Sequence, residues 1–244
     1  MLGQKKKGKD TYVLVDGENI IFSIQNKYGL RLNFHRVVQM LTELYGDVKV
    51  FVFGHFSDDG NGLFLAVKQH IQSCPHTHVV DTRVSNKPHR EQSDLAMLEE
   101  LTMGINGLFQ NLDAYERAVF MTGDGSMLRA ALHCRDVFDL DTIVMAEEGT
   151  INASFMDAGI NVVHVDPIVN NLLVVNKLDD DIFAAAGAGS VDDMLEAVQV
   201  NHLMHTPAQA NERERDRIRS INQVRRELIR HRINLMLQAK GQKE

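Results

Sequence analysis

Short runs of Val, Ile and Phe alternate along the chain with stretches of helical periodicity, and this alternation limits the fold more than any other feature. Strands are predicted at Tyr12–Val15, Val48–Phe53, His78–Asp81, Ala118–Thr122, Thr142–Met145 and Val162–Val165. Helices are predicted at Asn33–Tyr45, Leu63–Gln72, Gln92–Leu101, Ser126–Arg135 and Ile151–Asp157. Most of the strands are apolar throughout, as expected of strands covered on both faces. The pattern predicts an α/β fold with a mainly parallel sheet between helices.

The charges divide the chain into an acidic body with two basic ends. Residues 1–10 hold four Lys and one Asp, and residues 209–244 hold ten Lys plus Arg and five Asp plus Glu. Their net charges of +3 and +5 leave −15 for residues 11–208, because the whole chain carries −7. A solvated acidic surface with solubilising tails accounts for this division. Carboxylates gathered for metal binding, with basic tails for phosphates, are the alternative.

Three regions are predicted: a basic tail at residues 1–10, an α/β domain at 11–183, and a helical extension at 184–244 that is basic at its end. The boundary lies at "AAAGAGS", which follows no phosphate-binding strand and fits a linker better than a nucleotide-binding loop. The chain has no apolar run near the roughly 18 residues of a membrane span. With two cysteines and no secretory signal at the N-terminus, a cytoplasmic protein is expected.

Acidic residues follow two of the predicted strands directly. Asp16 comes after "YVLV", and Asp124 lies in "TGDGSM" after "AVFM". Asp94 and Asn19 lie near predicted helix starts. A strand-end or capping role explains each residue singly. Ligands of open α/β sheets bind beyond the carboxyl ends of the strands, so the three Asp are expected to converge there, where a cation would offset their repulsion.

Three segments, "VLVDGENI", "SDLAMLEEL" and "VFMTGDGSM", resemble the signature segments of the NYN domain family, a branch of the PIN-like metal-dependent nucleases. The resemblance covers about Tyr12 to Val165. It implies a PIN-like fold in which Asp16, Asp94 and Asp124 bind the metal.

The resemblance also assigns roles around these carboxylates. It implies that Asn19 is the conserved amide beside the metal, so that Asp16, Asn19, Asp94 and Asp124 form the catalytic set. Ser126 stands where the family motif has a second Asp, and Glu91 where a Lys often precedes the middle Asp. Asn19 and Ser126 are predicted to contact the substrate.

Carboxylates of this kind suit Mg²⁺ or Mn²⁺, which bind phosphate oxygens and activate water for in-line attack. The predicted function is a metal-dependent endonuclease, with RNA favoured because the resembling family acts mostly on RNA. A non-catalytic nucleic-acid-binding or scaffold protein, its site weakened at Ser126, is the alternative. A phosphatase of another α/β family fits less well, because no second Asp lies two residues after Asp16.

The C-terminal region carries an apolar stripe at spacings of three and four, formed by Ile221, Val224, Leu228, His231 and Leu235. It predicts a helix that packs on its own domain or pairs with another copy or a partner protein. Four arginines on other faces of this helix are predicted to bind nucleic-acid backbone, namely Arg225, Arg226, Arg230 and Arg232.

A zinc site formed by His70, Cys74, His76 and His78 is the weaker interpretation of "HIQSCPHTH", because no second ligand pair follows at finger spacing.

Overall fold

The chain divides into two compact units. Unit 1 comprises residues 1–22 and 33–170, and unit 2 comprises residues 23–32 and 171–244. The expected boundary between residues 183 and 184 lies inside unit 2. The computed structural model describes residues 10–54, 56, 63–82, 96–97, 115–174, 177–187, 190–204, 206 and 208–241.

Unit 1 contains a parallel sheet with the strand order β4-β3-β1-β5-β6-β7. Every pairing between neighbours in this sheet is parallel. The α/β prediction is therefore confirmed, and each expected strand lies within two or three residues of an observed one. The strands are β1 (Asp10–Asp16), β3 (Val48–Gly54), β4 (Thr77–Asp81), β5 (Tyr115–Met121), β6 (Asp141–Ala146) and β7 (Asn161–His164).

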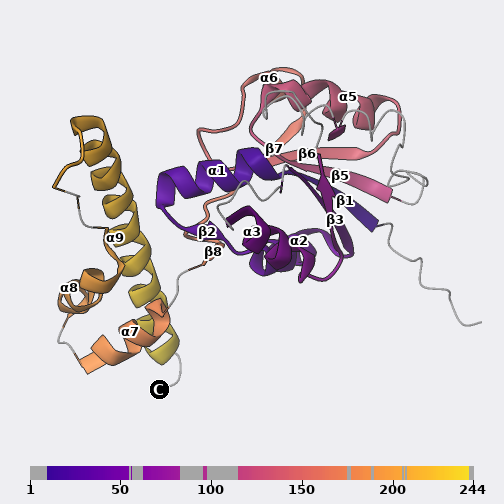
Figure 1. Cartoon of the computed structure of the whole chain (residues 1–244). Coiled ribbons are helices and arrows are strands. Elements are labelled where there is room, and N and C mark those ends of the chain that lie inside the picture. Colours follow the sequence, from indigo (N-terminus) through magenta and orange to yellow (C-terminus); the bar gives the residue numbers. More distant parts are fainter. Residues whose placement is uncertain are drawn as a thin grey trace, which may run out of the picture. The chain divides into compact units, whose positions relative to one another are not determined.

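Helices cover both faces of this sheet. Helices α2 (Phe34–Tyr45) and α3 (Leu63–Gln72) lie on one face, and α5 (Leu128–Asp136) and α6 (Ser154–Asp157) lie on the other (Figure 1). The predicted helix at Gln92–Leu101 falls almost wholly outside the described residues. For helix α1 (Gly17–Tyr28) only a start near Asn19 was expected, without a range; the helix begins directly after β1 and its last residues belong to unit 2.

Alternate residues of the central strands fill two separate layers of core. Tyr12 and Leu14 of β1 pack with Phe120 of β5 and with Ala131 and Cys134 of α5 in one apolar cluster. Val13 and Val15 are also fully buried, because successive side chains of a strand point to opposite faces. Burial of the strands on both faces explains their continuous apolar sequence.

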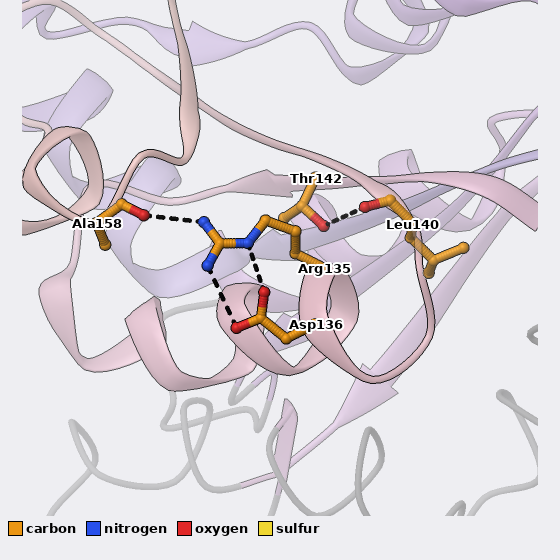
Figure 2. A network of polar contacts seen from close by, with 5 residues as sticks. All are labelled: Arg135, Asp136, Leu140, Thr142 and Ala158. Atoms are coloured by element: carbon orange, nitrogen blue, oxygen red, sulfur yellow. Dashed lines mark hydrogen bonds and ion pairs between the residues drawn. The ribbon is translucent and has the colours of Figure 1, made fainter.

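A network of polar contacts lies where α5 and α6 end in unit 1 (Figure 2). Arg135 donates to both carboxylate oxygens of Asp136, at 2.7 and 3.2 Å, and to the carbonyl oxygen of Ala158 at 2.8 Å. Thr142 donates to the carbonyl oxygen of Leu140. Hydrogen bonding to Arg135 lowers the pKa of Asp136. The network joins the ends of two helices, away from the carboxyl ends of the strands.

The imidazole of His70 in α3 caps the start of α2. Its Nε2 accepts a hydrogen bond from the main-chain N–H of Phe34 at 3.2 Å, which requires a neutral ring. Burial, and then the neighbouring His35, lower the pKa of His70 from the ordinary 6.5. The unfolded chain therefore takes up the proton first. The stabilising contribution is complete above about pH 6.5 and is lost as the pH falls below it.

We expect urea unfolding of the wild type to show this loss as the pH falls below about 6.5. The added slope stays below that of one proton, about 1.4 kcal/mol per pH unit. His70→Gln keeps an acceptor for Phe34 but does not titrate, so its stability should depend less on pH. His164→Gln, at an exposed histidine of β7, is the matched control. Identical pH dependence in wild type and His70→Gln would show that the cap does not titrate.

Unit 2 pairs a short antiparallel ribbon with helices. Strand β2 (Arg31–Leu32) pairs with β8 (Leu173–Val174). Helix α9 (Glu212–Gly241) packs against α7 (Leu178–Ala184) and α8 (Val191–His202). Of the two alternatives for the C-terminal helix, packing within its own unit is found. Ile221 and Leu228 of the predicted stripe are buried, as are Ile218, Ile229 and Ile233, while Leu235 is 43% exposed.

No helix among the described residues is long and apolar enough to cross a membrane.

Candidate functional site

The strand order of unit 1 reverses between β1 and β5. From β1 the chain proceeds outward to β3 and β4, and after β5 it proceeds the other way to β6 and β7. Such a switch point leaves a crevice outside the carboxyl ends of the two central strands, where ligands of open α/β sheets bind. Val15 pairs with Met121, so Asp16 and Thr122 leave the sheet at the same level.

Asp16 is the last residue of β1 and is held at both carboxylate oxygens. Its Oδ1 accepts the main-chain N–H of Asn19 at 3.1 Å, which caps the start of α1. Its Oδ2 accepts the Thr122 hydroxyl at 3.3 Å. Asp16 is only 4% exposed. Burial and two hydrogen bonds fix the direction of this carboxylate.

Asp124 lies in the turn between β5 and α5 and is joined to Asp16 through Thr122. The main-chain N–H of Asp124 donates to the Thr122 hydroxyl oxygen at 3.1 Å. The Asp124 Oδ1 accepts the N–H of Ser126 at 2.9 Å. No hydrogen bond to Oδ2 is found within the described ranges. The exposed Asp124 thus presents one open carboxylate oxygen to solvent.

Asn19 forms the second link between the two strand ends. Its side-chain Oδ1 accepts the main-chain N–H of Gly123 at 3.3 Å. The hydrogen bonds Asn19–Gly123 and Asp16–Thr122 together hold the start of α1 against the end of β5. They determine the relative position of the two acidic turns.

Two glycines admit the loop between β6 and α6, residues 147–153, against the turn that carries Asp124. A Cβ atom on Gly123 would lie 2.2 Å from the carbonyl oxygen of Thr150, a backbone atom. A Cβ on Gly125 would lie 2.7 Å from Nδ2 of Asn152, a side-chain atom. The N–H of Asn152 donates to the Gly123 carbonyl oxygen at 3.0 Å. Because glycine has no side chain, the loop at residues 147–153 can approach the turn closely at both positions.

The predicted site residues fall into three groups: those at the switch point, those outside the described residues, and the four arginines of α9. Asp16, Asn19, Asp124 and Ser126 come together at the switch point. Asp94 lies outside the described residues, as does Glu91. Within the described ranges, no group of three His, Cys, Asp or Glu side chains could hold a metal. This also covers the zinc set at residues 70–78, where His70 instead accepts from Phe34 and Cys74 donates to the His70 carbonyl oxygen.

Two residues at this edge were not predicted. Thr122, 1% exposed, was assigned only to a strand, although its hydroxyl contacts both acidic turns. Glu147, 7% exposed, follows β6 directly, while Asp16 is the last residue of β1. The rule that selected Asp16, a polar residue directly after an apolar run, would have selected Glu147, whereas Thr122 was counted as the last residue of its strand.

The four predicted substrate arginines all lie on α9 in unit 2, and three make contacts within that unit. Arg225 donates to the carbonyl oxygens of His202 at 2.6 Å and Gly29 at 3.2 Å, and burial lowers its pKa. Arg230 pairs with an exposed Asp192 at 2.9 Å, and Arg232 pairs with Asp179 at 3.0 Å.

Arg226 differs from the other three. It is exposed, and no hydrogen bond or ion pair of Arg226 is found among the residues that the structure describes. Of the four arginines it is the one with a guanidinium group left available.

Fold and site together define the class: an α/β protein with hydrogen-bonded acidic turns at the switch point of a parallel sheet. No protein-family model matches the chain, and no curated protein matches it. Among solved structures, the chain is similar to a protein of unknown function from Vibrio parahaemolyticus. The TM-score is 0.53 at 13% sequence identity, over 70% of this chain and 100% of that one. A likeness at this identity shows the fold alone, and it agrees with the α/β sheet of unit 1.

Proposed function

We propose that this protein is a metal-dependent endonuclease that hydrolyses phosphodiester bonds, with RNA as the favoured substrate. The observation that carries the proposal is the joining of Asp16 and Asp124 through Thr122 at the switch point of the sheet. The resemblance of "VLVDGENI" and "VFMTGDGSM" to the NYN signature segments supports it. The two free, buried cysteines support a cytoplasmic setting for this activity.

The donor set at this edge fits a hard divalent cation. Carboxylate oxygens are the ligands that Mg²⁺ and Mn²⁺ prefer, and Asp124 has one oxygen without a hydrogen bond from the described residues. Asp16 and Asp124 would hold the cation, with Asp94 as the third ligand that the family resemblance implies. When bound, the cation would offset phosphate charge and activate water.

The chain's own residues supply position and substrate contacts. Thr122 orients Asp16 by donating to Oδ2, and the Ser126 N–H orients Asp124 by donating to Oδ1. Since Asn19 uses its oxygen on Gly123, its amide nitrogen is the end that can donate to a phosphate. Arg226 is the α9 arginine best able to contact nucleic-acid backbone, since Arg225 already donates to two carbonyl groups.

A non-catalytic nucleic-acid-binding protein is the second candidate. Ser126, which stands where the resembling family has an Asp, is the observation that favours it. A site with one carboxylate fewer would hold a cation less tightly and could bind a strand without cutting it.

Incubation of the purified chain with labelled structured and unstructured RNAs, in Mn²⁺ or in EDTA, distinguishes these functions. We expect cleavage products in Mn²⁺ and none in EDTA, because removal of the cation removes the activated water. Single-stranded DNA of the same sequence tests the preference for RNA. Binding without cleavage in every condition would support the second candidate, and neither binding nor cleavage would contradict both.

A further inference from the structure

The loop between β6 and α6 brings an amide donor, the side chain of Asn152, to the turn that carries Asp124. The loop is attached to the Asp124 turn by the hydrogen bond from the Asn152 N–H to the Gly123 carbonyl oxygen, at 3.0 Å. The Asn152 side chain also reaches this turn, since Nδ2 lies 2.7 Å from the position of a Cβ on Gly125. Asn152 therefore borders the same turn as the candidate metal ligand.

The orientation of the Asn152 amide is fixed by a neighbour. Its Oδ1 accepts the main-chain N–H of Ser154 at 3.0 Å, so the other end of the group is the nitrogen. Nδ2 carries two N–H donors, and no acceptor for them is found in the part of the chain that the structure describes. The side chain is exposed, so these donors are open to a ligand from solvent.

A neutral donor suits this place better than a cation would. An arginine or lysine here would pair with Asp124, whereas an amide can donate to an anion without neutralising the carboxylate. Residues 11–208 carry a net −15, so a phosphate approaching the site needs donors that compensate for repulsion. Hydrogen bonds to an ionised oxygen are also stronger than those to a neutral one.

We propose that Asn152 is a substrate-contacting residue that donates a hydrogen bond to a non-bridging phosphate oxygen of the nucleic acid. This assignment rests on the proposed nuclease function. It gives the site a phosphate contact that does not depend on the metal, supplied by a loop outside the segments that resemble the NYN family.

Two substitutions separate substrate contact from a structural role. Asn152→Asp keeps an oxygen for the Ser154 N–H but replaces the donor with an anion. Asn152→Ala removes both the donor and the oxygen that accepts from Ser154. Asn33→Asp is the matched control, because the Oδ1 of Asn33 likewise accepts a main-chain N–H, that of Arg36, and Asn33 does not border the Asp124 turn.

Affinity for a fluorescent oligouridine, measured by anisotropy in EDTA, should fall roughly tenfold in Asn152→Ala and at least as much in Asn152→Asp. In Mn²⁺ both variants should raise KM more than they lower kcat. Thermal stability should follow the opposite order, with Asn152→Asp closer to wild type because its carboxylate can still accept the Ser154 N–H. Asn33→Asp should bind as wild type does.

Unchanged affinity and KM in both Asn152 variants, in a wild type that binds and cleaves, would overturn this assignment alone. Losses that follow stability, with Ala worse than Asp, would also overturn it, because they would show a structural role. A wild type that neither binds nor cleaves RNA would overturn the proposed function and this contact with it.

Discussion

Asp16→Asn should abolish cleavage while leaving the protein folded. The substitution removes one ligand charge from the candidate metal site, and we expect the rate in Mn²⁺ to fall at least about 1000-fold, equivalent to about 4 kcal/mol of transition-state stabilisation. The Asn oxygen can still accept the N–H of Asn19, and the new NH₂ group can donate to the Thr122 oxygen. Stability should therefore change by only about 1 kcal/mol. Single-turnover cleavage and thermal unfolding measure the two effects.

Asp166→Asn provides the matched control for charge. Asp166 follows β7 at the same edge of the sheet, is exposed, and accepts the main-chain N–H groups of Ile168 and Val169. Its replacement removes the same charge from a turn that does not border the switch point, and cleavage should persist. Wild-type cleavage by Asp16→Asn, still abolished by EDTA, would show that Asp16 does not hold the cation.

Gly123→Ala should destabilise the protein more than Ala at any other glycine that the structure describes in unit 1. The new Cβ would lie 2.2 Å from the Thr150 carbonyl oxygen and 2.8 Å from its carbon, so backbone must move. We expect a loss of about 3 kcal/mol in the free energy of unfolding, measured with urea. The movement should also displace the Gly123 N–H from Asn19 and so reduce cleavage.

Alanine at two other glycines should cause smaller losses of stability and provides a comparison. In Gly125→Ala the nearest atom is the amide nitrogen of Asn152, a side chain that can rotate away, so the loss should be smaller. In Gly187→Ala no atom lies within 4 Å of the new Cβ, and stability should be nearly unchanged. Equal stabilities for the Gly123 and Gly187 variants would show that the loop between β6 and α6 is not packed on the turn.

The sheet could be predicted because its strands are buried on both faces. Residues such as Val13, Val119 and Val144 are apolar for the same reason that they are fully buried, so periodicity and burial indicate the same elements. The sequence indicated a helix start near Asn19 but not the range of helix α1, because "GENI" has the composition of a turn. Its start depends instead on Asp16, whose side chain caps Asn19.

The site was predicted only in part, because position after a strand does not say how side chains meet. Asp16 and Asp124 were found from their sequence positions. Their connection through Thr122 depends on the pairing of Val15 with Met121, which no pattern within one strand specifies. The arginines of α9 were selected by charge alone. Charge could not reveal that Arg225 would donate to two carbonyl groups within unit 2.

Unit 2 is assembled from two separate stretches of the chain, residues 23–32 and 171–244. The chain therefore passes between the units after residues 22, 32 and 170, and no single cut releases unit 2 whole. A fragment ending at residue 170 would lack β8, the partner of β2, and would also lack Ile221, which lies against Gly29. The basic C-terminal helix is thus an integral part of a folded unit rather than a removable tail, and point substitutions such as Arg226→Gln probe it more cleanly than truncation does.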